Sequence, residues 1–227
     1  MNFAIVLAAG ASQRMKGIDK LFYLVKNKPL MVYTLQTLEK HPQIKKIVLV
    51  AKKDKIKKVK GLVKKYKMSK VALIVPGGQE RQDSSFCGLS ALRNLGVRAE
   101  DIVLFHNGAN PLVSSGEISR VIEAGKKYGA AVLAQPLKDT LKRAGKKGFI
   151  AETLDRRKFF LAQTPQAIKY ALAKKAFEAA RSGRFIGTDD VSLVERLGKK
   201  VKIVPCSYRN IKATTPDDLE IVKSFIK

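Results

Sequence analysis

The sequence predicts an α/β fold, a Rossmann-like three-layer sandwich with a mostly parallel sheet and a projecting β-hairpin arm that serves dimerisation. Short apolar runs rich in β-prone residues alternate with amphipathic helical patterns from residue 3 to residue 136. This alternation is typical of a parallel sheet covered by helices on both faces. Residues 137–163 interrupt the rhythm. We therefore expect a single domain over 1–227, with 137–163 as an inserted arm.

The order of the expected elements follows from periodicity and from helix-start signals. Strands are expected over 3–7, 44–51, 71–75, 101–106, 130–136 and 201–205. Helices are expected over 29–41, 81–95, 168–181 and 188–197, within the lysine-rich segment 52–70, and from Ser114 and Thr215 onward. Ser114 with Glu117 forms a capping-box pattern, and Thr215 followed by Pro216 is a second helix start.

The segment 137–163 has the pattern of a hairpin. Residues 138–143 and 149–154 form its two expected strands, and 144–148 form the turn. An isolated two-stranded ribbon is only marginally stable in water, so this hairpin needs a surface to lie against. A second copy of the chain would provide one. The alternative is a hairpin that folds back onto its own domain.

Composition limits the class of protein. The chain has 227 residues, of which 45% are hydrophobic, and no apolar run approaches the ~20 residues of a membrane span. The N-terminus enters the first strand without a signal-peptide pattern, so we expect a cytoplasmic protein without a membrane partner. Cys87 and Cys206 are far apart and are expected to be reduced core residues, and His41 and His106 give no zinc-binding spacing.

The charge balance is strongly basic, with 45 Lys and Arg against 19 Asp and Glu, a net charge of +26. Much of it lies in 52–70, where Val59, Leu62 and Val63 recur at helical spacing and leave the lysines on a solvated face. Such charge attracts polyanionic substrates. Nucleic-acid binding is not expected, because interleaved aromatic residues and binding motifs are missing from the sequence.

The first strand runs into a turn suited to phosphate. Ala8, Ala9 and Gly10 leave the backbone open, and the cations Arg14 and Lys20 follow. Backbone N–H groups and cations together hold phosphates. The turn matches neither the dinucleotide-binding fingerprint nor the P-loop pattern. A plain strand-to-helix turn is the alternative. In a parallel sheet, ligands lie beyond the carboxyl ends of strands, so loops 8–20, 76–84 and 106–111 should share one crevice.

A series of motifs in fixed order resembles one family. The motifs are LAAGASQRM (7–15) with Lys20, GGQERQDS (77–84), HNGANP (106–111), DTLKR (139–143), TLDR (153–156), QTPQ (163–166), TDD (188–190) and NIKATTPDDL (210–219). From Phe3 to Phe225 the chain resembles the 2-C-methyl-D-erythritol 4-phosphate cytidylyltransferases, within the sugar-phosphate nucleotidyltransferases. The resemblance implies transfer of CMP from CTP to 2-C-methyl-D-erythritol 4-phosphate, with release of pyrophosphate, in isoprenoid precursor synthesis. It also implies Mg²⁺ and a homodimer.

The resemblance implies roles for individual residues. Arg14, Lys20 and Lys212 would be catalytic cations that stabilise charge on the reacting phosphates. The nucleotide would lie against Ala8, Ala9, Gly10, Gly78, Arg81 and Ser84. The acceptor would lie against Asn110, Thr140, Arg156, Thr164, Thr188 and Asp189. The acceptor residues that lie on the arm would act on the active site of the neighbouring subunit. The alternative for Arg156 is a surface arginine without a binding role, and the alternative for Thr164 is an ordinary turn residue before Pro165.

Three positions depart from the family pattern. Ser12 stands where a second glycine is common, and Asn107 and Asn110 stand where the family has aspartate and arginine. Asn107 would therefore be a weakened metal ligand, since it keeps an oxygen and loses the charge. Asn110 removes a cation near the acceptor. The alternatives are a cytidylyltransferase for another polyol phosphate, such as ribitol 5-phosphate, and a nucleotide-binding homologue with weakened or no activity.

Overall fold

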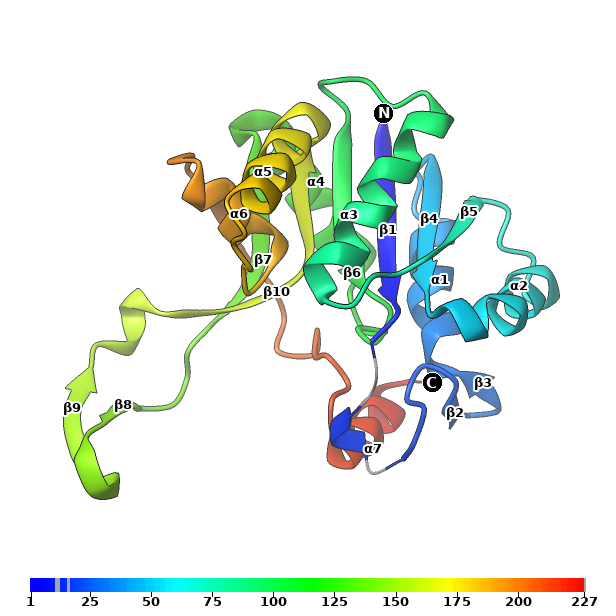
Figure 1. Ribbon diagram of the computed structural model, residues 1–227. Helices are drawn as coiled ribbons and strands as arrows, with labels where there is room; N and C mark the ends of the chain where they lie inside the picture. The colour runs from blue at the N-terminus through cyan, green and yellow to red at the C-terminus, as the bar shows by residue number, and fades with distance from the viewer. Residues whose placement is uncertain (11–12, 16, 227) are drawn as a thin grey trace.

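A computed structural model of the chain describes residues 1–10, 13–15 and 17–226. It contains a seven-stranded sheet with the order β11-β7-β10-β6-β1-β4-β5 (Figure 1). The strands of this sheet are β1 (Asn2–Ala8), β4 (Lys46–Ala51), β5 (Val71–Pro76), β6 (Ile102–Asn107), β7 (Ala130–Pro136), β10 (Phe160–Lys169) and β11 (Lys202–Pro205). Among them only β10 is antiparallel to its neighbours, so the expected mostly parallel sheet is confirmed.

Helices cover both faces of the sheet. They are α1 (Leu30–Lys40), α2 (Ile56–Lys65), α3 (Arg81–Ala91), α4 (Ser115–Tyr128), α5 (Tyr170–Ser182), α6 (Asp190–Arg196) and α7 (Pro216–Phe225). The capping boxes at Ser114 and Thr215 are both present. The helix expected over 29–41 begins one residue later, because Pro29 is the N-cap residue that precedes α1.

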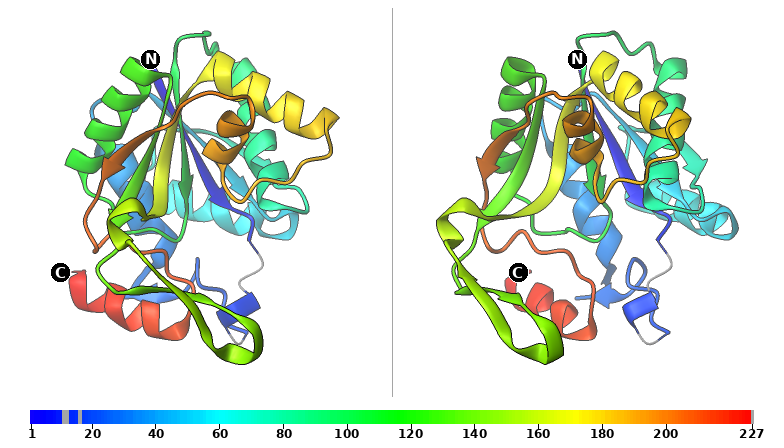
Figure 2. Two further views of the ribbon diagram at one scale, coloured as in Figure 1. Left: turned by 90° about the vertical axis from the view of Figure 1, so that its left-hand side faces the viewer. Right: turned by 60° about the vertical axis from the view of Figure 1, so that its left-hand side comes forward.

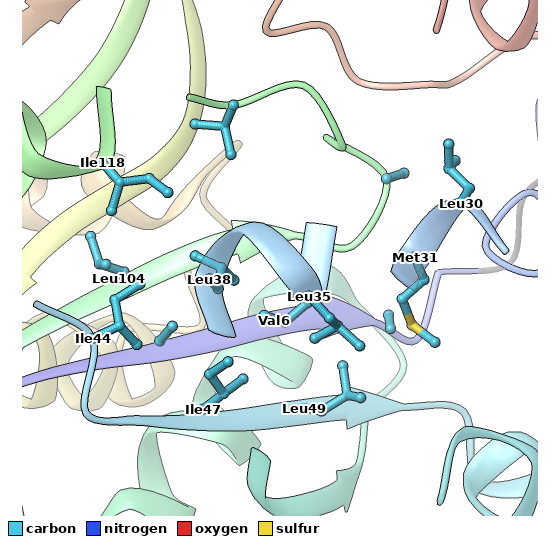
Figure 3. Close-up of a cluster of buried hydrophobic side chains, with 14 of the residues drawn as sticks. Val6, Leu30, Met31, Leu35, Leu38, Ile44, Ile47, Leu49, Leu104 and Ile118 are labelled. Carbon is cyan, nitrogen blue, oxygen red and sulfur yellow. The ribbon is translucent and has the colours of Figure 1, made fainter. Parts of the chain in front are cut away.

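Two hydrophobic cores fill the space between the layers. Successive side chains of a strand point to opposite faces, so Ala4 and Val6 of β1 pack with α1 and α4, whereas Phe3 and Ile5 pack with α3, α5 and α6. Figure 3 shows the first core, where Leu35 and Leu38 of α1 lie over β1 and β4. Figure 2 shows the helices on the two sides of the sheet. The expected three-layer sandwich is confirmed.

Strand β10 is the main departure from the expected elements. The helix expected over 168–181 begins only at Tyr170, and the residues before it form a central strand between β7 and β6. Pro165 lies at an irregularity where the pairing with β7 shifts between Ala162 and Gln166. A strand interior tolerates proline at such a bulge.

The expected hairpin is present and projects from the body. It consists of β8 (Leu141–Ala144) and β9 (Ile150–Leu154), which pair with each other and with no strand of the main sheet as described (Figures 1 and 2). Phe149 and Ile150 at its tip are 74% and 65% exposed. Within the range 137–163, the last residues belong to β10, whose Phe160 pairs with Pro136 of β7.

A few short elements were not expected. A two-stranded ribbon, β2 (Leu24–Val25) with β3 (Lys28–Pro29), precedes α1, and short 3-10 turns lie at Gln13–Met15, Lys53–Lys55, Leu92–Leu95, Lys146–Gly148 and Arg156–Lys158. No helix among the described residues is both long enough and apolar enough to cross a membrane.

Candidate active site

The carboxyl ends of β1, β5 and β6 meet around one cavity of about 470 Å³. Strand β1 lies between β4 and β6, so the chain leaves β1 at the point where the strand order reverses direction. Such a point is where open α/β sheets bind ligands. The lining residues are Leu7, Ala9, Gly10, Lys20, Leu21, Lys52, Lys53, Asp54, Gly77, Gly78, Gln79, Glu80, Arg81, Ser84, Asn107, Ala109 and Lys212.

The bend after β1 provides open backbone at this cavity. A Cβ added at Gly10 would meet no atom of the structure within 4 Å, so the space beside it is free for a ligand. Ala9 and Gly10 line the cavity, and Ala8 lines a neighbouring one that also includes Gly10. Ser12 lies outside the described residues.

Five cationic side chains line the cavity, and the pKa values of two of them, Lys20 and Lys212, are lowered there. Burial and the nearby charges of Lys212 and Arg14 lower the pKa of Lys20 to about 8. Desolvation and the charges of Arg81 and Arg14 lower the pKa of Lys212 as well. Neighbouring cations therefore disfavour the charge of Lys20 and of Lys212, and an anionic ligand beside them would relieve this repulsion.

The loop after β5 forms another wall of the same cavity. Gly77 packs so tightly that a Cβ there would overlap the Ala9 side chain and lie 2.7 Å from Ser84 Oγ. The N–H of Gly78 donates to the same hydroxyl at 3.2 Å. Helix α3 then begins with a reciprocal capping box between Glu80 and Asp83. This loop holds Gly78, Ser84 and Arg81 on the cavity wall.

A second cavity of about 300 Å³ adjoins the first and shares Arg81, Asn107 and Lys212 with it. Its remaining lining residues are Ala162, Gln163, Thr164, Gln166, Thr188 and Asp189. The two cavities therefore meet at two cations and one amide.

Asn107 belongs to a chain of amide side chains. Asn210 donates to the carbonyl of Thr164 at 2.9 Å, so its own oxygen accepts from Asn110 Nδ2 at 3.3 Å. The oxygen of Asn110 in turn accepts from Asn107 Nδ2 at 3.2 Å. Because a backbone carbonyl fixes the direction of this chain, the free oxygen of Asn107 is the atom available to the cavities.

The donor set around Asn107 limits what a cation would find. Among the described residues, no group of three or more His, Cys, Asp or Glu side chains is placed to hold a metal. His106 is fully buried, and burial lowers its pKa to about 3, so it is a neutral core residue. Mg²⁺ commonly takes few protein ligands and leans on substrate phosphates. The residues therefore fit a cation that arrives with a triphosphate and meets one amide oxygen.

Three expected acceptor residues lie outside both cavities. Asn110 is fully buried in the amide chain. Thr140 and Arg156 lie on the exposed arm, where the guanidinium of Arg156 donates to the carbonyl of Lys138. Arg14 lines neither cavity, and its charge acts on Lys20 and Lys212. The roles given to these four residues stay predictions.

Several lining residues were missed in the sequence. Lys52, Lys53 and Asp54 follow the carboxyl end of β4, a position that the strand-end rule could have identified. Gln163 and Gln166 belong to the QTPQ motif, but its strand was not recognised. Asp190, which pairs with Arg81 at 2.6 Å, carries no sequence signal for that contact because 109 residues separate the two.

An open backbone at Gly10, clustered cations and two adjoining cavities at the switch point of a mostly parallel sheet are the features expected of a nucleotidyltransferase. The family model of 2-C-methyl-D-erythritol 4-phosphate cytidylyltransferase matches residues 2–227, so the chain belongs to this family of cytidylyltransferases. The curated relative from Pelotomaculum thermopropionicum is 43% identical over 226 residues, covering 99% of this chain and 93% of its own. That from Geobacillus kaustophilus is 42% identical over 228 residues, covering 100% and 97%.

Solved structures agree with this assignment. The crystal structure of 4-diphosphocytidyl-2C-methyl-D-erythritol synthase from Anaerococcus prevotii superposes with a TM-score of 0.84 at 30% identity, covering 99% of this chain and 95% of that one. The 2-C-methyl-D-erythritol 4-phosphate cytidylyltransferase from Francisella tularensis gives a TM-score of 0.82 at 28% identity, covering 99% of both chains.

Proposed function

We propose that the protein transfers CMP from CTP to 2-C-methyl-D-erythritol 4-phosphate and releases pyrophosphate, in isoprenoid precursor synthesis. The observation that carries the proposal is the pair of adjoining cavities that share Arg81, Asn107 and Lys212. A donor nucleotide in one and an acceptor phosphate in the other would bring the two reacting phosphates to this boundary. Family membership supports the identity of both substrates.

The larger cavity suits the nucleotide. The backbone at Ala9 and Gly10 and the cations Lys20 and Lys212 would hold the triphosphate, and Gly78, Arg81 and Ser84 would frame the cytosine. Such transfer asks the protein mainly for positioning and charge neutralisation. Arg14, Lys20 and Lys212 would stabilise the charge that develops on the attacked phosphorus and on the leaving pyrophosphate. A divalent cation held by the triphosphate and by Asn107 Oδ1 would neutralise further charge.

The smaller cavity suits the acceptor. Thr164, Thr188 and Asp189 offer hydroxyl and carboxylate groups to a polyol phosphate. Among the described residues, only two cations line this cavity for the acceptor's phosphate. Thr140 and Arg156 would complete it from the arm of a second copy, in a cytoplasmic homodimer with shared sites. The exposed apolar tip of the arm supports this arrangement, because Phe149 and Ile150 contact little of their own chain.

Pyrophosphate release tests the reaction. With CTP, Mg²⁺ and a panel of polyol phosphates, we expect 2-C-methyl-D-erythritol 4-phosphate to be the preferred acceptor, ahead of ribitol 5-phosphate. Replacing Lys212 by Gln should lower kcat/KM by about 10²–10³-fold, because a preorganised charge is lost. Lys174→Gln, at an exposed ion pair on α5, is the matched control and should match the parent. If none of the polyol phosphates in the panel supports pyrophosphate release, the proposal is contradicted.

Subunit mixing tests the shared site. Lys212→Gln and Arg156→Gln should each be nearly inactive alone. In a mixed dimer, one site would carry both changes and the other neither, so random exchange should restore about a quarter of parental activity. Activity equal to the sum of the separate variants would show that Arg156 serves its own chain or no site at all.

A further inference from the structure

Helix α3 is tied both to the first residue of α6 and to the loop before it. The guanidinium of Arg81 pairs with the carboxylate of Asp190 at 2.6 Å. One residue further on, the side chain of Gln82 spans the loop, because its Nε2 donates to the carbonyl of Phe185 at 2.9 Å and its Oε1 accepts from the N–H of Gly187 at 2.8 Å. The first turn of α3 therefore holds the segment that leads to Thr188 and Asp189.

The ion pair is asymmetric. The Asp190 side chain is 1% exposed, whereas that of Arg81 is 31% exposed and lines both cavities. The second oxygen of Asp190, Oδ1, is buried and has no hydrogen-bond partner among the described residues. A buried carboxylate depends strongly on its single cation. Any movement of Arg81 toward a ligand therefore acts on Asp190 and on the start of α6.

Strand β10 fixes the other end of this connection. The side-chain oxygen of Gln166 accepts from the N–H groups of Asp190 and Val191, both at 3.0 Å. Its Nε2 donates to the carboxylate of Asp189 at 2.7 Å. Gln166 and Asp189 both line the smaller cavity. A continuous set of contacts thus runs from Arg81 through Asp190 to the groups that face the acceptor.

We propose that Asp190 is a positioning residue that couples the two substrate cavities through Arg81. A nucleotide that orders Arg81 in the larger cavity would also order the α6 start, and so raise the affinity of the smaller cavity for the acceptor. Coupling of this kind is reciprocal, so the acceptor would raise nucleotide affinity by the same factor. The proposal rests on the proposed function, because it assigns the cavities to CTP and the polyol phosphate.

Calorimetric titration tests the coupling without turnover. The probes are cytidine 5′-diphosphate, which lacks the pyrophosphate leaving group, and 2-C-methyl-D-erythritol 4-phosphate, each titrated alone and in the presence of the other. In the parent we expect each probe to tighten the other by about fivefold or more. In Asp190→Asn, which keeps the size and removes the charge, this ratio should fall to about 1. A parent ratio of 1, or a parental ratio in the variant, would overturn the proposal.

Two further variants separate coupling from folding. Glu100→Gln removes an ion pair with Lys169 of similar length, 2.5 Å, on the exposed surface, and should keep the parental ratio. Gln82→Leu removes the second tie while leaving Asp190 intact, and should lower the ratio even if Asp190→Asn fails to fold. If neither cytidine 5′-diphosphate nor CTP binds the parent, the proposed function itself is overturned. Binding of both probes without coupling would overturn only the role of Asp190.

Discussion

Lys20 lies among other cations in the free protein, and this arrangement favours the binding of an anion beside it. Its pKa is lowered to about 8 by burial first and by the charges of Lys212 and Arg14 second. A lysine whose folded pKa lies below its unfolded value of 10.5 binds fewer protons when folded. Stability of the free protein therefore rises with pH between about 8 and 10.5, and the full cost of the charge applies below 8. A bound triphosphate reverses this cost, because it favours the charged form.

We therefore predict proton uptake when CTP binds. At pH 8–9 a substantial share of Lys20 is neutral in the free protein and becomes charged beside the triphosphate. Calorimetry in two buffers with different ionisation enthalpies measures this uptake directly. Lys20→Arg should reduce it, since a guanidinium stays protonated at these pH values, and the remainder would come from Lys212, whose pKa is also lowered. Equal binding heats in both buffers for the parent would contradict the prediction.

Asn107 carries a second prediction at this scale. Asn107→Asp supplies an anionic oxygen at the cavity boundary and should raise Mg²⁺-dependent turnover. It also removes the N–H that donates to Asn110, so we expect a loss of about 1 kcal/mol in the free energy of unfolding. Turnover at several Mg²⁺ concentrations and a denaturation curve check both parts. An unchanged or lower rate would exclude a metal role for this position.

At the scale of elements, the loop from β5 to α3 owes its shape to close packing. Gly77 lies against Ala9 and Ser84 with no room for a Cβ. The bend after β1 and the start of α3 therefore fix each other, and a change in one loop shifts the other.

Gly77→Ala should displace this loop and raise the KM for CTP by about tenfold or more, as a small misplacement in a reacting site does. Gly61→Ala is the matched control, because a Cβ there meets no atom within 4 Å and the residue lies inside α2. That control should leave KM unchanged and stabilise the helix by about 0.8 kcal/mol. Steady-state kinetics and thermal unfolding of the two variants distinguish the effects.

The boundary between β10 and α5 could not be predicted from the sequence pattern. The period of 168–181 is helical throughout, but Ile168 and Lys169 belong to β10, because pairing with β6 and β7 overrides local preference. Pro165 and the polar residues Gln163 and Gln166 are also atypical of a central strand, so the sequence pattern did not indicate one. By contrast, β1, β4, β6 and β7 were predictable, since buried parallel strands read as continuous apolar runs.

At the scale of the whole molecule, the net charge of +26 creates a field that favours anionic substrates. The exposed lysines of α2 follow Lys52 and Lys53 in the chain, and these two residues line the larger cavity. The meeting of loops 8–20, 76–84 and 106–111 was predictable, because each loop leaves the carboxyl end of a parallel strand. The contact between Arg81 and Asp190 was not predictable, because it depends on the packing of α3 against α6.

We predict that CTP association slows markedly between 50 and 300 mM salt, because screening shortens the range of the field to about 10 Å or less. Lys57, Lys60 and Lys64 are exposed on α2, and none of them lines either substrate cavity. Replacing all three by Glu should reduce the salt dependence while leaving kcat unchanged. Stopped-flow measurement of CTP binding tests this, and a parental salt slope in the variant would show that the field arises elsewhere.

The pairing of Pro136 with Phe160 closes the base of the hairpin. Both legs of the hairpin leave the sheet from directly opposed residues, and the N–H of Leu137 still donates to the carbonyl of Phe159. The segment between Leu137 and Phe159 is therefore an insertion whose two ends are held together at the sheet. Its tip can lengthen, shorten or change without altering a residue of either core, so the sheet and its cavities keep their geometry whatever the tip contacts.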